Sequence, residues 1–506
     1  MKHIKHITLA ASLLALVACN DDKFSDVIPT IDPVEDNNPG GDNNQTVTSS
    51  RDEQYRPQIH FTPAQNWMND PNGMVYADGV WHLYYQYNPS GNDWGNMSWG
   101  HATSTDLIHW TEKPVAMTPN QYGDIFSGSA ICDKENVAGF GKNAILAFYT
   151  ASGERQQQCL AYSLDGGITY TQFEGNPIIP NTDMPDFRDP KVFYHEESGK
   201  YIMALAKGWD YSVDFWASTN LKNWTKLSEF RTSNQRMNKG QWECPDLIKV
   251  PYKGGEKWVL IVSLNPGGPA SGSGTSYFVG DFDGTNFVAD DLDYPLWIDA
   301  GADNYAGVTW SNIPDGRSIY IGWMNNWNYA GAVPCSPWRS AMTLPREITL
   351  EDMNGSPVLS TKVVKEIDGI AGEWTNAVNG ICNDGDAYEM SVILDPSENK
   401  TFTVGNSAGE HITIQVNPEA KKIIASRTSS SGVVSFNGMF SIPSMSAPYD
   451  TDADKLELHI YVDHSSVEIL SADGKTAITC LVYPTIPYDR IEGIDEVSYR
   501  PISSIW

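Results

Sequence analysis

The chain has 506 residues, of which 41% are hydrophobic, enough for two or three domains with apolar cores. Its formal charge of −29 excludes a nucleic acid as the partner, because phosphate backbones are bound by clustered lysines and arginines. The 17 tryptophans and 24 tyrosines favour β-strands and also make flat, partly polar binding surfaces, although packing in a β core accounts for most of them.

The first 18 residues predict an export signal. Lys2 and Lys5 lie in a short basic region, and residues 7–18 form an apolar stretch. This stretch is too short for a membrane-spanning helix, which needs about 20 residues. It ends in Leu-Val-Ala followed by Cys19, which resembles the bacterial lipobox; an ordinary signal peptide with a chance cysteine is the alternative. We expect residues 1–18 to be a lipoprotein signal peptide and Cys19 to be lipidated.

The segment after Cys19 predicts a surface location and a flexible connection. Asn20-Asp21-Asp22 resembles the acidic surface-export signal of some Gram-negative lipoproteins. We expect an exported protein, anchored to the outer membrane only through its lipid and facing the cell surface. Residues 19–54 are rich in Asp, Asn, Pro, Gly, Ser and Thr, which cannot bury enough apolar surface to become ordered, so they are predicted to form a flexible tether.

The remaining six cysteines are scattered, without a Cys-x-x-Cys pair or a histidine at metal-ligand spacing. We therefore expect no metal and no cofactor, mostly buried free thiols, and a monomeric protein. A disulfide bond between two of them is the alternative, because exported proteins can form one. The cysteines are Cys132, Cys159, Cys244, Cys335, Cys382 and Cys480.

Beyond the tether, short β-branched or aromatic runs alternate with Gly, Asn and Asp turns, which predicts an all-β protein. Five apolar strands follow polar turns, with starts roughly 55–65 residues apart. These strands are Trp81–Tyr87, Ala144–Thr150, Tyr201–Ala206, Trp258–Leu264 and Ile319–Trp323.

A second repeat is in phase with the first. Each copy is an Asp or Asn turn that delivers an aromatic residue to a strand, at 104–110, 163–170, 218–224 and 281–287. Five units of roughly 60 residues, each with room for four strands, predict a five-bladed β-propeller over residues 55–350. A large β-sandwich is the alternative, but it would not explain the phase-locked repeats.

A further strand precedes each repeated strand and is predicted to be the innermost strand of its blade. These inner strands are Gly73–Tyr76, Gly128–Cys132, Lys191–Tyr194, Leu247–Val250 and Gly307–Trp310. Polar residues stand just ahead of the inner strand in every unit. Because equivalent positions on successive blades surround one channel, these polar groups should converge at one of its mouths. They are Asn69-Asp70, Phe126-Ser127, Arg188-Asp189, Glu243-Cys244 and Asp303-Asn304-Tyr305.

The periodicity changes after residue 347. Shorter alternating strands follow, such as Leu456–Val462 and Ser466–Leu470. They predict a separate C-terminal β-sandwich over residues 360–506.

Three carboxylates, Asp70, Asp189 and Glu243, stand among the converging groups. Hydrolysing a glycoside with retention requires two carboxyl groups about 5–5.5 Å apart, one to attack the anomeric carbon and one to protonate the leaving oxygen. Crowded carboxylates repel, so one should have a raised pKa, and Glu243 suits that role. A structural cluster or a calcium site is the alternative, although metal ligands usually gather within one loop.

The motifs that hold these carboxylates resemble those of glycoside hydrolase family 32, the family of invertases, inulinases and levanases. Residues 67–73, Trp-Met-Asn-Asp-Pro-Asn-Gly, are similar to its signature, 187–190 to its Arg-Asp-Pro motif, and 242–245 to its Glu-Cys-Pro motif. Residues 322–327, Gly-Trp-Met-Asn-Asn-Trp, resemble a further motif of the family. The resemblance is strong from Gln58 to Glu347 and weaker beyond, where residues 463–468 are similar to a motif of the family's sandwich domain.

The resemblance implies a five-bladed β-propeller followed by a β-sandwich, and a double-displacement mechanism. Asp70 would be the nucleophile, Glu243 the general acid/base, and Asp189 the stabiliser of the transition state. A structural ion pair for Arg188, and core packing for Trp94 and Trp323, are the alternatives to substrate contact. Cys244 is expected to tune Glu243 or simply to pack. The residues expected to line the fructosyl pocket are Trp67, Asn69, Gln86, Trp94, Phe126, Ser127, Arg188 and Trp323.

The leading hypothesis is hydrolysis of a fructan, levan or inulin, to fructose or fructo-oligosaccharides, since a surface lipoprotein suits a polymer too large to import. Invertase action on sucrose, fructosyl transfer and non-catalytic fructan binding are the alternatives. The three intact carboxylates argue against the last. Linkage preference and endo or exo action depend on loop shapes that the sequence does not specify.

Overall fold

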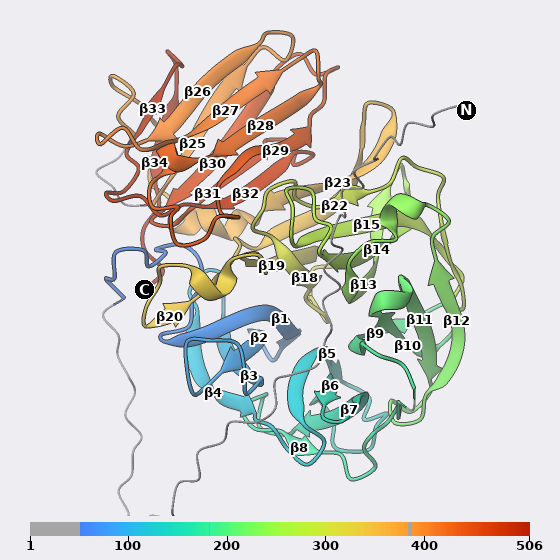
Figure 1. The fold of residues 1–506 in the computed structure, drawn as a ribbon. Coiled ribbons are helices and arrows are strands. Elements are labelled where there is room, and N and C mark those ends of the chain that lie inside the picture. Colours follow the sequence, from blue (N-terminus) through green and yellow to red (C-terminus); the bar gives the residue numbers. More distant parts are fainter. Residues whose placement is uncertain (1–50, 182, 383–386) are drawn as a thin grey trace, which may run out of the picture. The chain divides into compact units, whose positions relative to one another are not determined.

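A computed structural model describes residues 51–181, 183–382 and 387–506 (Figure 1). The predicted signal peptide, Cys19 and the predicted tether up to residue 50 lie outside the described residues. Among the residues that are described, no helix is long and apolar enough to cross a membrane. The elements are β-strands and short 3₁₀ helices, so the prediction of an all-β protein is confirmed.

Five antiparallel sheets follow one another along the first part of the chain. The first contains β1 (Asn66–Ala77), β2 (Val80–Asn88), β3 (Ser98–Ser104), β4 (Thr111–Met117) and, parallel to β1, β20 (Trp338–Arg339). The second contains β5 (Asp124–Asp133), β6 (Ala144–Ser152), β7 (Gln156–Ser163) and β8 (Thr171–Gln172). The third contains β9 (Phe187–His195), β10 (Lys200–Lys207), β11 (Ser212–Ser218) and β12 (Thr225–Arg231).

The fourth sheet contains β13 (Gln241–Tyr252), β14 (Gly255–Asn265), β15 (Gly274–Phe282), β16 (Phe287–Ala289) and β17 (Leu296–Trp297). The fifth contains β18 (Tyr305–Thr309), β19 (Ser318–Met324), β21 (Ala341–Met342), β22 (Arg346–Met353) and β23 (Ser356–Val363). Three 3₁₀ helices lie between strands of this part: η1 (Gly208–Asp210), η2 (Gln235–Met237) and η3 (Ala330–Ala332).

The remaining strands form two sheets. One has the order β24 (Thr375–Asn376), β34 (Ser498–Pro501), β25 (Tyr388–Leu394), β30 (Leu456–Asp463), β31 (Ser466–Ser471) and β32 (Ala477–Leu481). The other has the order β29 (Ile442–Pro448), β28 (Lys422–Arg427), β27 (His411–Asn417), β26 (Lys400–Gly405) and β33 (Arg490–Glu492). The helix η4 (Lys365–Gly369) lies between β23 and β24, and η5 (Ser429–Ser431) lies between β28 and β29.

The five predicted repeat strands lie within β2, β6, β10, β14 and β19, the second strand of each of the first five sheets. The first strands, β1, β5, β9, β13 and β18, surround a common centre (Figure 1), and each contacts the next, with β18 returning to β1. β6 is buried along almost its whole length because neighbouring sheets cover both of its faces, whereas the outer strand β4 is largely accessible. The succession of the five sheets around this centre, called the ring below, therefore corresponds to the repeat in the sequence.

Each of the five inner strands begins earlier than the sequence predicts and is interrupted by a register shift. The shifts in β1, β9 and β13 occur at Pro71, Pro190 and Pro245, respectively. Proline has no backbone N–H to donate to the neighbouring strand. Next to two of these prolines, Asp189 and Cys244 have positive φ angles of 66° and 47°. Such bulges turn side chains out of the normal alternation. In β1, β5, β9 and β13 the polar residues predicted ahead of the strand therefore lie inside it, whereas Asp303 and Asn304 do precede β18.

The described chain begins with residues that were predicted to belong to the tether but are packed. The guanidinium of Arg51 lies 3.7 Å from the centre of the Trp506 ring, and its Nη2 lies 2.6 Å from a carboxylate oxygen of Glu112. The Gln54 side-chain amide donates to the backbone carbonyl of Thr485. Residues 51–54 are thus held against the folded chain.

Buried ionic groups join the fifth sheet to the C-terminal sheets. Arg346 of β22 is fully buried and contacts both Glu468 of β31, at 2.5 Å, and Asp299, at 2.9 Å. Glu468 also contacts His60, at 2.9 Å, and the other ring nitrogen of His60 lies 2.7 Å from Asp463. Because unpaired buried charges are costly, this network fixes how the two parts pack together.

Candidate active site

One cavity at the centre of the inner strands brings the three predicted catalytic carboxylates together. It has a volume of about 320 Å³, and nine of the eleven predicted catalytic and substrate-binding residues line it. Its lining consists of Asn69, Asp70, Gln86, Trp94, Phe126, Ser127, Arg188, Asp189, Glu243 and Trp327. Asp70, Asp189 and Glu243 come from the bulges of β1, β9 and β13.

The carboxylate of Asp70 is held at both oxygens. Ser127 Oγ donates to Oδ2 at 2.6 Å, and Asn69 Nδ2 donates to Oδ1 at 2.9 Å. The indole N–H of Trp67 in turn donates to Asn69 Oδ1 at 2.8 Å, which fixes the orientation of that amide. Asp70 is thereby aimed at one point of the cavity before any ligand arrives.

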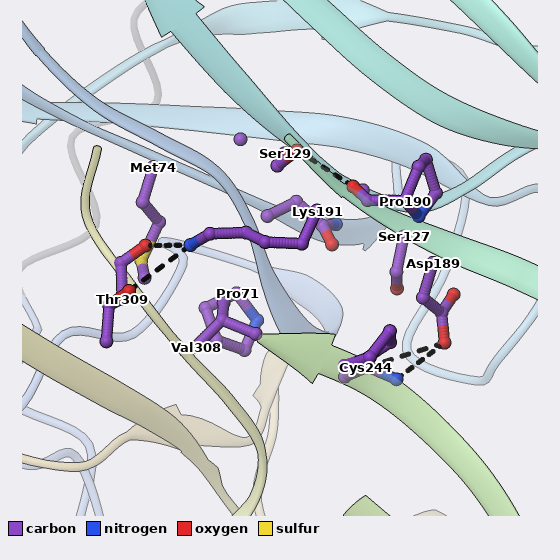
Figure 2. A pocket seen from close by; sticks show the side chains of 14 residues that line it. Pro71, Met74, Ser127, Ser129, Asp189, Pro190, Lys191, Cys244, Val308 and Thr309 are labelled. Carbon is purple, nitrogen blue, oxygen red and sulfur yellow. Dashed lines mark hydrogen bonds between the residues drawn. The ribbon is translucent and has the colours of Figure 1, made fainter. Parts of the chain in front are cut away.

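Asp189 is buried and receives the backbone N–H of Cys244 at its Oδ2, at 2.9 Å (Figure 2). Burial raises the pKa of Asp189 to about 7, the guanidinium of Arg188 opposes this, and the nearby carboxylates of Glu243 and Asp70 add to it. The Cys244 thiol lies 3.7 Å from Asp189 Oδ2 and 3.6 Å from Asp70 Oδ2. The cluster can therefore carry a proton near neutral pH.

Glu243 accepts a hydrogen bond at each carboxylate oxygen, from Arg188 Nη2 at 2.8 Å and from the Tyr305 hydroxyl. Burial raises the pKa of Glu243, Arg188 lowers it, and the charge of Asp70 raises it. The sequence predicted a raised pKa for Glu243; the structure raises that of Asp189 as well. Two carboxyl groups with raised pKa values beside a third carboxylate suit acid/base chemistry.

Arg188 bridges Glu243, the candidate acid/base, and Asp186. Its Nη1 donates to Asp186 Oδ1 at 2.9 Å, while its Nε lies 4.0 Å from Asp189 Oδ2. This Nε is buried and has no hydrogen-bond partner among the described residues. Arg188 thus forms an ion pair and keeps a donor free beside the cavity.

Comparison with known proteins identifies the family to which the chain belongs. The sequence matches the N-terminal domain of the glycosyl hydrolases of family 32 over residues 60–361 and the C-terminal domain of that family over residues 359–501. The chain belongs to glycosyl hydrolase family 32. It is therefore a glycoside hydrolase.

Relatives and solved structures of the family are similar over most of the chain. A levanase of Bacillus subtilis is 42% identical, with 91% of this chain and 72% of the relative covered. An extracellular exo-inulinase of Aspergillus niger is 38% identical, with 86% and 90% covered. The crystal structure of an exo-inulinase from Aspergillus awamori has a TM-score of 0.81 and 35% identity, with 90% and 100% covered.

Two predicted pocket residues of this family 32 chain lie behind the cavity instead of lining it. Trp67 and Trp323 are 1% and 0% exposed, and their ring centres lie 6.1 Å apart. Trp327, which was not predicted, packs 4.9 Å from Trp323 and 5.9 Å from Trp67 and does line the cavity. The signal for Trp327 was its place at the end of the motif Gly322–Trp327, which resembles a family motif.

The fifth inner strand supplies less to the site than the sequence predicts. The Asp303 carboxylate accepts from Arg427 of β28 at 2.6 Å and from the Tyr329 hydroxyl at 2.5 Å, and is fully buried away from the cavity. The Asn304 side chain accepts from the hydroxyl of Tyr320. Asp303 is thus the counter-ion of the buried Arg427 guanidinium. Of Asp303, Asn304 and Tyr305, only Tyr305 contacts one of the three catalytic carboxylates, that of Glu243.

A second buried ion pair closes the centre beneath the carboxylates. Lys191 Nζ lies 2.9 Å from Asp246 Oδ2 and donates to the Thr309 carbonyl at 2.7 Å. Figure 2 shows Lys191 reaching Thr309 on one side, with Asp189 and Cys244 on the other; the cavity between them measures only about 20 Å³. Within the described residues, no group of three or more His, Cys, Asp or Glu is placed to hold a metal ion.

The cysteines give no sign of redox chemistry. All six that lie within the described residues are free thiols, and all but Cys132 are buried. Burial raises the pKa of Cys244 far above that of an ordinary thiol, and the charges of Asp189 and Asp70 raise it further. A protonated thiol is a poor nucleophile.

Proposed function

We propose that this chain is a retaining glycoside hydrolase that cleaves the β-fructofuranosyl linkages of fructans, levan or inulin, by double displacement. The observation that carries the proposal is the meeting of Asp70, Asp189 and Glu243 in one cavity that has room for a sugar ring. The names of the similar proteins, a levanase and exo-inulinases, support fructans as the substrate class.

Asp70 attacks C2 of the fructosyl unit while Glu243 transfers its proton to the departing glycosidic oxygen, which leaves as a hydroxyl. The fructosyl–Asp70 ester is then attacked by water, whose proton returns to Glu243, and Asp70 is released as a carboxylate. Ser127 and Asn69 hold the attacking oxygens in place. Asp189, stabilised by the Cys244 N–H, accepts hydrogen bonds from the fructosyl hydroxyls as positive charge develops on the ring.

The test combines substrates with variants. The purified enzyme is incubated with levan, inulin and sucrose, and the products are resolved over time. We expect Glu243→Ala to lower the rate about 10²–10⁴-fold, and Asp70→Ala to lower it roughly 10⁴-fold or more. Glu256→Ala, which removes an exposed carboxylate from β14, serves as the matched control.

Retention is tested separately with methanol as the acceptor, because a double displacement yields the methyl β-fructofuranoside and an inverting reaction yields the α-anomer. Circular dichroism and thermal unfolding check that the variants are folded. Near-normal turnover by folded Asp70→Ala or Glu243→Ala, or an inverted product, would contradict the proposed roles.

We propose that the first five sheets are the blades of a five-bladed β-propeller and that the two C-terminal sheets form a β-sandwich. The boundaries expected from the sequence, 55–350 and 360–506, then move so that the propeller ends at Val363 and the sandwich follows it. The closed series of contacts among the inner strands supports the propeller. The pairing of β22 with β19 supports extending the last blade to Val363. Limited proteolysis that released a stable fragment ending before β18 would contradict this division.

We also propose that residues 1–18 are a lipoprotein signal peptide, that Cys19 carries the lipid and that the tether, shortened from the predicted 19–54 to 19–50 because residues 51–54 are packed, joins a monomeric enzyme to the outer cell surface. The lipobox-like sequence ending at Cys19 supports the anchor. In cells, Cys19→Ala should abolish incorporation of labelled fatty acid and release activity from the membrane fraction. Unchanged labelling, or a dimer in light scattering, would refute the corresponding part.

A further inference from the structure

The hairpin that joins β10 to β11 carries a half-exposed tryptophan beside the active site. The helix η1 forms its tip, and Trp209 at the tip is 49% exposed. Lys207 pairs with Phe187, the first residue of β9, and with Ser212 of β11. The tip therefore projects from the end of the sheet at which Arg188 and Asp189 enter the cavity.

The tip lies against the residues that support Glu243. The backbone N–H of Gly208 donates to the Asp186 carbonyl at 3.0 Å, and the Asp186 carboxylate accepts from Arg188. A Cβ at Gly208 would lie 2.7 Å from the side chain of Gln241, so a larger residue would displace one of the two. Gln241 begins β13 two residues before Glu243. Trp209 is thus placed at the rim on the acid/base side of the cavity.

Charged side chains fix the tip without using the indole ring. Lys207 Nζ lies 2.9 Å from Asp210 and 3.2 Å from Glu229, and Arg231 contacts Asp210 as well. Tyr211, with a φ of 52°, closes the turn in the left-handed region. These pairs hold the hairpin, and about half of the Trp209 side chain stays exposed. An aromatic ring exposed beside a binding cavity is available to a ligand that extends beyond that cavity.

The cavity itself is already lined by aromatic side chains. Trp94 and Phe126 lie with ring centres 6.1 Å apart next to Asp70, which the mechanism places at the fructosyl unit. Glu243 protonates the oxygen of the departing chain, so that chain leaves across the acid/base side. Trp209 is an exposed aromatic residue on that side and lies outside the lining of the fructosyl cavity.

We propose that the indole face of Trp209 binds the leaving-group part of a fructan, the fructosyl units beyond the scissile bond, and so determines preference for chain length. The inference rests on the proposed function. Furanose rings present C–H groups that pack on the electron-rich face of an indole, while their hydroxyls stay in water. Trp209 is a specificity-determining residue: it adds binding for long substrates and takes no part in bond breaking.

The test compares Trp209→Ala, Trp209→Phe and the unmodified enzyme on substrates that differ only in the leaving group. Methyl β-D-fructofuranoside has no leaving sugar, sucrose has one, and fructo-oligosaccharides of increasing length and levan have more. Trp374→Ala is the matched control, because Trp374 is 42% exposed but precedes β24 in the C-terminal sheets. Thermal unfolding should be unchanged in all variants.

For Trp209→Ala we expect about a twofold to tenfold fall in kcat/KM on the longer oligosaccharides, mainly through KM. Cleavage of methyl β-D-fructofuranoside should be unchanged, Trp209→Phe should recover most of the loss, and Trp374→Ala should lose nothing. An equal loss on every substrate would show that Trp209 acts through Arg188 and would overturn the proposal, as would no loss on any. An unmodified enzyme that cleaves no fructoside would overturn the proposed function as well.

Discussion

The buried contact between His60 and two carboxylates predicts a stability that depends on pH in a defined direction. Burial alone would lower the pKa of His60, but the hydrogen bonds to Asp463 and Glu468 outweigh it and raise the pKa to about 9. An unfolded chain has the ordinary value of 6.5. Because the folded state binds the proton more tightly, this stabilisation is complete below pH 6.5 and is lost as the pH rises through 9.

The magnitude follows from the two pKa values. Their difference, at roughly 1.4 kcal/mol for each pH unit, corresponds to about 3 kcal/mol of unfolding free energy. His60→Gln keeps a side chain of similar size but removes the charge between Asp463 and Glu468. At pH 6 we expect the variant to be less stable by about 3 kcal/mol. The difference from the unmodified protein should shrink to near zero by about pH 9.5.

The assay is urea unfolding of both proteins at several pH values between 6 and 9.5. Other titrating groups affect both proteins alike, so only the difference between the two curves is interpreted. His109→Gln is the matched control, since His109 pairs with Asp106 on an exposed surface and such pairs contribute at most about 1 kcal/mol. A difference for His60→Gln that stays constant across the whole pH range would refute the reasoning.

Two further predictions concern the active site. The Tyr305 hydroxyl donates a hydrogen bond to Glu243 and so stabilises the charged form of that carboxylate. Tyr305→Phe should therefore raise the pKa of Glu243 and move the alkaline limb of the kcat/KM profile to higher pH. An alkaline limb that stayed in place or moved to lower pH would contradict this. Cys244 supports Asp189 through its backbone N–H, so Cys244→Ala should lose less than about tenfold in kcat, and iodoacetamide at pH 7.5 should leave the enzyme active because the thiol is buried and protonated. Stoichiometric inactivation by the reagent would count against that reasoning.

The sequence predicted the strands of the ring well because their apolar runs recur at a fixed spacing. The second strand of every one of the five sheets was found this way, and β6 is buried along almost its whole length because it is covered on both faces. The starts of the inner strands were predicted too late. Residues such as Asp70 and Glu243 looked like loop residues ahead of a strand, whereas they occupy bulges inside it.

Other features depend on contacts that no local pattern reveals. The partner of Asp303 is Arg427, which lies 124 residues away in the C-terminal sheets, so the sequence could not show that this carboxylate is taken. Trp67 and Trp323 sit within family motifs, but motif membership does not separate a residue that contacts the ligand from one that packs behind it. Trp209 belongs to no motif, and only the pairing of its hairpin with β9 places it at the rim.

The ion pair between Lys191 and Asp246, with Thr309, fills the centre of the ring below the carboxylates. A polysaccharide consequently cannot thread through the molecule, and everything that enters the cavity must leave by the opening through which it came. A sugar that is released into the cavity occupies the same space that the next fructosyl unit requires. Free product therefore competes directly with substrate, and its departure sets an upper limit on how often the enzyme can turn over.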